Sequence, residues 1–370
     1  MKIRLIHVML ILLFLPVLVF GGNVDVTTGS HTQDFDLFEV GSPNLPPTFT
    51  IIYESRSPYQ GPMGKKWTHT FDLYLDDDGD SMLQKDLFGD QYLYVLEKGK
   101  YVAKGGDRST LVKEANGTFV IKRDGLTYRY DRNRHLTTLI DRTDAKTSFV
   151  FSNGKLAKVV TPRNKSITFT YGDGGRLTRV TAPDGKSYAL GYNEVTLTSI
   201  TYPDGGAWRF TYDPKAYMLT KTDPEGHTVT YAYDGKYRVI RGTNHLGQSQ
   251  TLSYPDSNDQ VRTTSMNDNG KITDYTYDMH TRTLNQQVDP DGGVTTYTHD
   301  EAGNVTSETD QSGRTTTYTY DDKKRMTSSR DPDGNVTTYR YDAAGKLISV
   351  AGPDGSTFQV PPEVQDGARQ

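Results

Sequence analysis

The sequence contains no cysteine, which excludes disulfide bonds and thiolate metal sites. Apolar residues make up only 34% of its 370 residues, a low share for a globular protein of this length. The net charge of −4 leaves no basic stripe for nucleic-acid phosphates, so nucleic-acid binding is not expected. His-Glu-x-x-His, Gly-x-Ser-x-Gly and P-loop motifs are also missing, which argues against the common hydrolase and nucleotide-binding classes.

Tyrosine and glycine are abundant instead, with 25 and 35 residues respectively. Tyrosine favours strands that have one packed face and one wet face, and glycine marks tight turns. This balance is typical of a chain with many short strands.

The first 22 residues have the layout of an export signal. Two basic residues precede an almost unbroken apolar run over residues 5–20, and a pair of glycines follows it. This layout predicts a secretory signal peptide over residues 1–22, cleaved near Gly21 or Gly22. An uncleaved membrane anchor is the alternative, but the run is shorter than the roughly 20 residues of a spanning helix. No later segment is apolar enough to span a membrane.

An aromatic residue recurs every 20–23 residues, in most cases just before an aspartate, and we take it as the anchor of a repeat. The predicted structural anchors are Tyr130, Tyr171, Tyr192, Tyr212, Tyr233, Tyr254, Tyr277, Tyr320 and Tyr341, and Phe151 and His299 occupy equivalent positions. Eight consecutive repeats carry a glycine seven residues before the anchor: Gly185, Gly205, Gly226, Gly247, Gly270, Gly292, Gly313 and Gly334. Glycine accepts a positive φ, so each repeat is expected to contain two turns and two strands.

The strand before each anchor alternates between aromatic and polar side chains. Ile167, Phe169 and Tyr171, for example, alternate with Thr168 and Thr170. A period of two predicts half-buried antiparallel strands, whose aromatic faces are buried only by neighbouring repeats.

The repeat follows the consensus Gly-x-x-Thr-x-Tyr-x-Tyr-Asp-x-x-Gly-x-Leu, which is matched best over residues 334–347 and 313–321. It resembles the YD repeat of Rhs proteins, with related repeats in Tc-toxin C components and teneurins. The resemblance covers about residues 110–358, in eleven repeats. It implies a β-ribbon that spirals into a shell around a toxic C-terminal polypeptide.

A second resemblance lies upstream, in the segments at residues 53–57, 61–64 and 67–69. They are similar to the uncharacterised domain that opens many Rhs proteins. We expect Trp67, Phe71 and Tyr53 to form a small core that caps the exposed edge of the first strand.

These features predict an all-β fold, in which a small β-rich N-terminal domain precedes a repetitive antiparallel β-hairpin ribbon, the YD-repeat spiral. The expected divisions are a signal peptide (1–22), an opening domain (23–80), an irregular β transition (81–109), the repeats (110–358) and a polar tail (359–370). No self-cleaving core motif and no toxin domain follow the repeats. Twenty-two strands spaced about 4.8 Å apart cannot seal a cavity around a folded toxin, so we expect an open partial shell.

Three other patterns suggest sites, and we favour a structural explanation for each. The run at residues 76–80 lacks EF-hand spacing and is expected to form a turn. The aspartate after each anchor, such as Asp131 or Asp321, is expected to bond the backbone of its own turn. His299 is expected to be a packed substitute for tyrosine. We therefore predict no catalytic residue, no cofactor and no metal.

The sequence favours a non-enzymatic, secreted scaffold in an Rhs-type toxin-encapsulating or contact-dependent system, with a C-terminal core or toxin polypeptide as its partner. The alternative is an extracellular adhesin that stacks its tyrosines on cell-surface polysaccharide. A secreted hydrolase is a third class, and nothing beyond export favours it. The resemblance implies a bacterial protein that is released or held at the cell surface.

Overall fold

The computed structural model describes residues 17–18, 23–25, 28–42, 45–86, 91–105, 107–254, 260–266, 271–278, 281, 283–342 and 345–360. Most of the predicted signal peptide and of the polar tail lies outside these residues. The chain divides into a larger unit of residues 31–230 and a smaller unit that joins residues 1–30 to residues 231–370. Among the described residues, no helix is long and apolar enough to cross a membrane.

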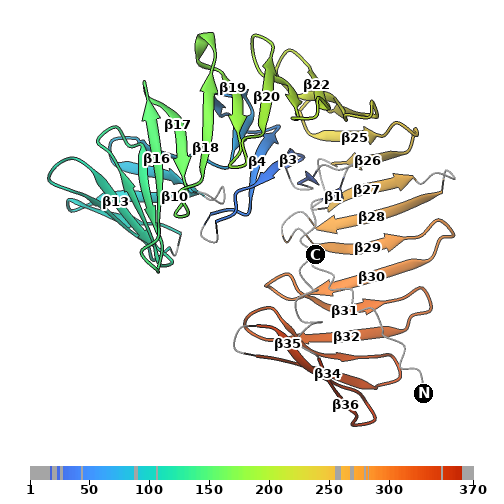
Figure 1. Ribbon diagram of the computed structural model, residues 1–370. Coiled ribbons are helices and arrows are strands. Elements are labelled where there is room, and N and C mark those ends of the chain that lie inside the picture. The colour runs from blue at the N-terminus through green and yellow to red at the C-terminus, as the bar shows by residue number, and fades with distance from the viewer. Residues whose placement is uncertain are drawn as a thin grey trace. The chain divides into compact units, whose positions relative to one another are not determined.

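The larger unit contains two antiparallel sheets and a short hairpin (Figure 1). An opening sheet consists of β3 (His31–Glu39), β4 (Thr48–Glu54) and β7 (Trp67–His69), and β5 (Gln60–Gly61) pairs with β6 (Gly64–Lys65). The second sheet is a ribbon in which each strand pairs with the next along the chain. Its strands are β8 (Tyr74–Asp77), β9 (Ser81–Lys85), β10 (Gln91–Glu97), β11 (Lys100–Ala103), β12 (Thr110–Lys113), β13 (Phe119–Arg123), β14 (Leu126–Tyr130), β15 (Leu136–Ile140), β16 (Lys146–Ser152), β17 (Lys155–Val160), β18 (Ser166–Tyr171), β19 (Leu177–Thr181), β20 (Ser187–Tyr192), β21 (Leu197–Thr201), β22 (Ala207–Tyr212), β23 (Met218–Thr222) and β24 (Thr228–Tyr233).

A helical turn, η1 (Asp173–Gly175), joins β18 to β19. The segment at residues 81–109, expected to be irregular, contains β9, β10 and β11, which pair as regular members of the ribbon. The ribbon therefore begins at β8, upstream of the repeats recognised in the sequence.

In the smaller unit, β1 (Val17–Leu18) pairs with β2 (Asn23–Val24), and a second run of hairpins forms an open antiparallel sheet. Its strands are β25 (Val239–Thr243), β26 (Ser249–Ser253), β27 (Gln260–Met266), β28 (Ile272–Asp278), β29 (Leu284–Val288), β30 (Val294–His299), β31 (Val305–Thr309), β32 (Thr315–Tyr320), β33 (Met326–Arg330), β34 (Val336–Tyr341), β35 (Leu347–Ala351) and β36 (Thr357–Gln359). The all-β hairpin ribbon expected from the sequence is confirmed.

The turn glycines adopt the backbone conformation that the sequence predicts. Seven of the eight have φ between 76° and 92°, and Gly270 lies outside the described residues. The amide of Gly185 donates to the carbonyl of Ala182 at 3.0 Å, and the amide of Gly334 donates in the same way to Asp331. Other residues are strained at such φ values, so glycine at this position sets where each hairpin turns.

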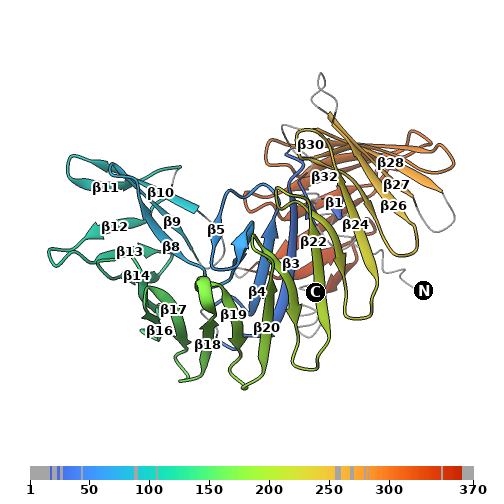
Figure 2. The same ribbon diagram turned by 90° about the horizontal axis from the view of Figure 1, so that it is seen from above.

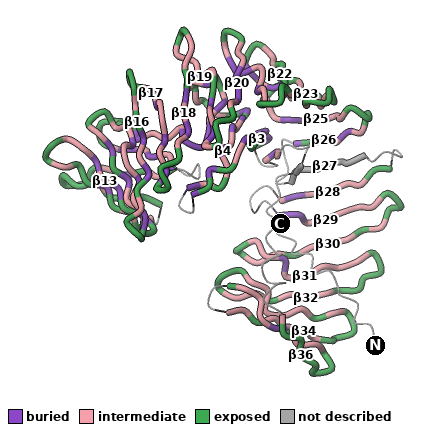
Figure 3. The backbone as a smooth tube through the Cα atoms, in the orientation of Figure 1, coloured by how far each residue is buried: buried purple, intermediate pink, exposed green. Residues whose placement is uncertain are grey.

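The aromatic face of the ribbon is buried to different extents along the chain (Figure 3). Two residues before the anchor, Phe149, Phe169 and Phe210 of the larger unit are 5%, 5% and 3% exposed. The corresponding Tyr318 and Tyr339 of the smaller unit are only partly buried. Adjacent repeats alone therefore bury this face incompletely.

The opening sheet supplies the missing cover in the larger unit, and Figure 2 shows β3 and β4 beside β20 and β22. Ring centres lie 6.1 Å apart for Phe71 and Phe149, and 5.1 Å apart for Trp67 and Phe210. The expectation that Trp67, Phe71 and Tyr53 cap the edge of the first strand was wrong, because they pack on the face of the ribbon. A one-layer sheet with an aromatic face needs a second layer more than it needs an edge cap.

Candidate functional site

The anchors coincide with β-bulges. In nine hairpins the register shifts by one residue between the anchor and the residue before it. The anchors at these bulges are Tyr130, Phe151, Tyr171, Tyr192, Tyr212, Tyr277, His299, Tyr320 and Tyr341, whereas Tyr233 ends β24 and Tyr254 follows β26. A bulge increases the local twist, so these nine hairpins share one distortion at one place.

Each bulged anchor pairs with an apolar residue five to seven positions further on. Tyr130 pairs with Leu136, and Tyr341 pairs with Leu347. These partners were not predicted from the sequence as a set. The leucine six positions after the tyrosine in the consensus is the signal that would have found them.

Several anchor tyrosines form a hydrogen bond to the preceding repeat. In each case the hydroxyl donates to a main-chain carbonyl fifteen residues earlier, on the residue that pairs with the previous anchor. These bonds join Tyr171 to Leu156 (3.0 Å), Tyr192 to Leu177 (2.5 Å), Tyr212 to Leu197 (2.5 Å) and Tyr341 to Met326 (3.0 Å). Consecutive bulges are therefore tied together through a side chain as well as through the strand ladder.

Burial makes ionisation of the anchor hydroxyls still less favourable than in water. It raises the pKa of Tyr277 to about 12 and the pKa values of Tyr171 and Tyr192 above their usual value. A hydroxyl that does not ionise at physiological pH remains a hydrogen-bond donor, as its carbonyl partner requires.

A cation from the preceding repeat covers the ring of several anchors. The pairs are Lys155 over Tyr171 (5.3 Å), Arg176 over Tyr192 (5.8 Å), Arg238 over Tyr254 (4.4 Å) and Arg325 over Tyr341 (4.8 Å). Arg238 and Arg325 also donate from Nε to the turn aspartates Asp234 and Asp321, each at 2.7 Å. The arginine therefore links the turn aspartate of its own repeat to the anchor ring of the next repeat, which is a second connection between consecutive repeats.

The aspartate after the anchor closes its turn. Asp321 Oδ1 accepts from the amides of Lys323 and Arg325, both at 2.9 Å, and Asp131 accepts from the amides two and four residues on at the same distance. A hydrogen bond from the Arg325 side chain, followed by one from its amide, lowers the pKa of Asp321. The predicted role of these aspartates in their turns is confirmed.

Tyr130 and His299 have surroundings unlike those of the four anchors that bond the preceding repeat. Tyr130 is 2% exposed, and its hydroxyl accepts from Gln84 at 2.8 Å. His299 ends β30 at a bulge, and its buried Nε2 has no hydrogen-bond partner among the described residues. Burial lowers the pKa of His299, so the ring is a neutral replacement for tyrosine that lacks the long reach of the hydroxyl.

A buried ion pair connects β13 to the end of β9. Arg123 Nη2 lies 2.9 Å from Asp86 Oδ2, Arg123 Nη1 donates to Gln84 at 2.9 Å, and the guanidinium carbon lies 3.4 Å from the ring centre of Tyr92. The two charged side chains are 5% and 3% exposed. A cleft of about 640 Å³ lined by residues 107–110 and 122–127 lies next to this pair. With its guanidinium engaged on several sides, Arg123 holds strands together, and the 37 residues that separate it from Asp86 left no local signal in the sequence.

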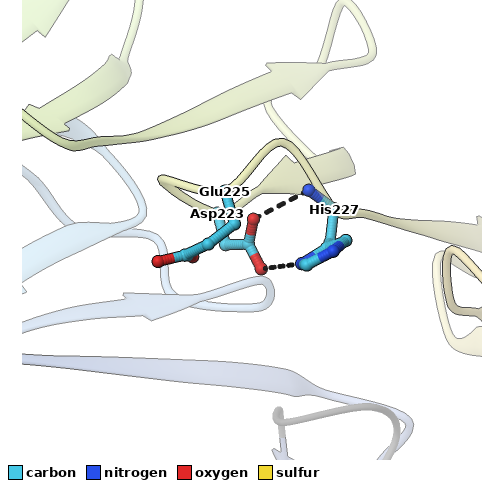
Figure 4. Close-up of side chains that lie close together, drawn as sticks. All are labelled: Asp223, Glu225 and His227. Carbon is cyan, nitrogen blue, oxygen red and sulfur yellow. Dashed lines mark hydrogen bonds and ion pairs between the residues drawn. The ribbon is translucent and has the colours of Figure 1, made fainter.

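Asp223, Glu225 and His227, in the turn before β24, form a group of three metal-ligand-type side chains, the one such group found in the described part of the chain (Figure 4). Their ligand atoms lie within 4.8 Å of one another. Asp223 accepts from the His227 amide at 2.7 Å and lies 3.0 Å from its Nδ1, as Figure 4 shows. Asp223 therefore acts like the other turn aspartates, and Glu225 and His227 are exposed. This cluster was not predicted from the sequence, although the Asp-x-Glu-x-His alternation at residues 223–227 was its signal.

The acidic run at residues 76–80 forms a turn, as expected. The Gly79 amide donates to Asp77 Oδ1 at 3.0 Å, and Gly79 has φ of 80°. Arg134 lies 3.6 Å from Asp77 and neutralises part of the local negative charge.

We expect Tyr341→Phe to lower the free energy of unfolding by about 1 kcal/mol, because the Met326 carbonyl loses a donor that compensates its desolvation. Tyr320→Phe is the matched control in the same unit, since the Tyr320 hydroxyl forms no hydrogen bond with a described residue. Urea denaturation followed by circular dichroism measures both changes. An equal or larger loss from Tyr320→Phe would contradict this account.

Comparison with protein families gives matches over most of the ribbon. Residues 107–288 match the family described as Teneurin YD-shell, and residues 284–310, 299–336 and 324–357 match the family described as RHS Repeat. Residues 21–101 match a domain of unknown function, DUF6531. Comparison with curated proteins gave no match.

Solved toxin structures also resemble the chain at low identity. The crystal structure of TcdB2–TccC3–Cdc42 is 12% identical over 84% of this chain and 23% of that chain, with a TM-score of 0.31. The Tc holotoxin pore of Photorhabdus luminescens is 12% identical over 89% of this chain and 25% of that chain, with a TM-score of 0.33. The chain spans about a quarter of the length of these toxin chains. On the family matches, which together run from residue 107 to residue 357, the chain belongs to the YD/RHS-repeat family.

Proposed function

We propose that the chain is a structural scaffold whose repeats form a shell-like wall and contribute no chemistry of their own. One observation carries this proposal: anchor tyrosines such as Tyr192 use the hydroxyl to bond the backbone of the preceding repeat. The turn aspartates and the cations over the anchor rings also make contacts within and between the repeats, and these contacts stabilise the fold. We assign the same structural role to all nine predicted tyrosines, including Tyr233 and Tyr254.

Along the chain we propose an opening domain over residues 23–80, repeats over 110–358 and a tail over 359–370, while residues 81–109, expected to be a transition, contribute β9, β10 and β11 to the ribbon. The family match over residues 21–101 supports an opening domain, and the contacts of Trp67 and Phe71 support its role as a cover. The partner is a C-terminal polypeptide of an Rhs-type toxin or contact system. A reading frame for such a polypeptide beside the gene would support this, and an unrelated intact operon would count against it.

Removal of one whole repeat tests the scaffold. Deletion of residues 313–333 removes β32 and β33 and joins one turn to the equivalent turn of the next repeat. We expect this variant to fold with proportionally less strand signal in circular dichroism, because stability in such arrays is a sum of neighbour terms.

Deletion of residues 313–322 is the control, because it removes β32 alone and puts β33 out of phase with its neighbours. This variant should lose far more stability in urea than the whole-repeat deletion. Equal losses from the two deletions would refute the modular scaffold.

Export is part of the proposal, and the leader-like layout of residues 1–22 supports it. When the chain is produced in a bacterial host, we expect the exported product to begin at or near Asn23. N-terminal sequencing of the protein outside the cytoplasm measures this, and an intact Met1 end on all exported protein would exclude cleavage.

A second candidate function is binding of polysaccharide by the half-buried tyrosines of the smaller unit. The Tyr318 hydroxyl donates to Glu308 at 3.3 Å, and the Tyr339 hydroxyl lies 3.3 Å from Ser329, so rings and polar groups alternate on one face. If this face holds sugar rings, Tyr318→Ala should weaken binding of the purified chain on a glycan array at least about fivefold, since each stacked ring contributes about 1 kcal/mol or more. Phe358→Ala, at an exposed position on β36, is the control. Lack of binding to any glycan would remove this function.

A further inference from the structure

A chain of polar side chains crosses the otherwise aromatic contact between the opening sheet and the ribbon in the larger unit. Around it, the Phe35 ring lies 5.3 Å from Trp208 and 5.1 Å from Phe210, and Trp67 lies 5.1 Å from Phe210. Inside this layer Lys221 of β23 reaches Gln33 of β3, with Nζ 2.6 Å from the amide oxygen. Polar groups buried among rings need defined partners, so the order of donors and acceptors here is constrained.

The Lys221–Gln33–His31 chain fixes the protonation of His31. Lysine can only donate, so the Gln33 oxygen accepts from Lys221 and its NH₂ group points to His31 Nε2, 3.0 Å away. His31 Nε2 must therefore accept, which requires a neutral ring protonated on Nδ1. His31, Gln33 and Lys221 are 0%, 2% and 5% exposed.

The charges around this chain favour the neutral ring. Burial and then the charge of Lys221 lower the pKa of His31 to about 3, and burial lowers the pKa of Lys221 to about 8. From β4, the Tyr53 ring lies 5.8 Å from His31, and its hydroxyl bonds the backbone of Ala216 and Met218.

Other titratable groups lie close to this contact. Lys66 bonds the carbonyl of Ser55, whose side chain accepts from the His31 amide. The Tyr212 hydroxyl accepts from Trp67 Nε1 at 3.1 Å. The residues named here that face His31 therefore add positive or neutral groups.

We propose that the opening sheet is an acid-releasable cover, which separates from the aromatic face of the ribbon when His31 takes up a proton beside Lys221. Protonation puts a hydrogen on Nε2, where it meets the NH₂ group of Gln33, and places a second positive charge in a buried site that already holds one. The hydrogen bonds from Lys221 through Gln33 to His31 can then no longer all be satisfied, and β3 loses its polar link to β23.

The pH window follows from linkage. In the unfolded chain His31 binds its proton near pH 6.5, and in the folded sheet only near pH 3. The stability that depends on neutral His31 is therefore complete above about pH 6.5 and is lost progressively as the pH falls towards about 3. His69 of the same sheet acts in the same direction, because burial lowers its pKa to about 4.

The turn aspartates of the ribbon take up protons at a lower pH than His31 does in the unfolded chain. Hydrogen bonds from the side chains of Arg325 and Asn335 lower the pKa values of Asp321 and Asp331 respectively. Their contribution is lost only as the pH falls below the ordinary value of 3.8. Release of the cover should therefore precede acid unfolding of the ribbon.

Tryptophan fluorescence reports on this contact alone. The chain has two tryptophans, and Trp67 of the opening sheet and Trp208 of the ribbon lie on its two sides. For the full-length chain, we expect the emission to shift to the red between about pH 6.5 and pH 4, while the strand signal in circular dichroism persists to lower pH. A fluorescence change that coincides with loss of the strand signal overturns the proposal.

Variants separate His31 from general acid sensitivity. His31→Gln retains a polar group near the position of Nε2 but cannot be protonated, and Lys221→Met removes the neighbouring charge at similar length. Each should lower the fluorescence midpoint by about one pH unit. His245→Gln, in an exposed turn, is the matched control and should leave the midpoint unchanged. Unchanged midpoints in both His31→Gln and Lys221→Met, or an equal shift in His245→Gln, refute the mechanism.

Discussion

An isolated two-stranded hairpin is marginal in water, because it buries too little apolar surface to offset the entropy of ordering its backbone. In this ribbon each hairpin is stabilised by its neighbour, and the hydrogen bond from an anchor tyrosine to the carbonyl of the previous repeat makes that dependence specific. Backbone hydrogen bonds between strands specify the register only weakly, since the same bonds can form after a shift along the strand. A side chain that reaches one particular carbonyl fixes the register, and the bulge at the anchor fixes the direction of that side chain.

The same repeat supports two different environments. In the larger unit, Phe149 and Phe210 lie beneath the opening sheet, whereas Tyr318 and Tyr339 hold equivalent places on a partly exposed face. Phenylalanine occupies three of the covered positions, at residues 149, 169 and 210, and tyrosine, with its polar tip, occupies both of these open ones. The polar chain at His31 is the exception within the covered face, and it makes that cover sensitive to protonation.

Much of this architecture could be read from local patterns. The spacing of the anchors, the positive φ of glycines such as Gly205 and the alternation at residues 167–171 depend only on neighbours along the chain. The opening sheet was placed wrongly, because contacts such as Trp67 with Phe210 join segments far apart in sequence and no local periodicity encodes them. The pairing of Gln33 with Lys221, across 188 residues, was invisible for the same reason. The bulges were not predicted, because a bulge is an extra residue on one strand relative to its partner, and the pairing register is not visible in one strand's sequence.

Because anchor tyrosines bond the preceding repeat, the repeats can fold in the order in which they are synthesised. Tyr171, Tyr192, Tyr212 and Tyr341 each bond a carbonyl made fifteen residues earlier, so such a repeat has its partner in place as soon as it leaves the ribosome. Short loops close quickly, and the ribbon can extend one hairpin at a time without waiting for the end of the chain. The opening sheet is synthesised first yet packs against β16–β22, so it must wait for about a hundred residues of ribbon. Until then its aromatic residues lack the layer that covers them, and transiently exposed apolar surface of this kind makes a chain prone to aggregation.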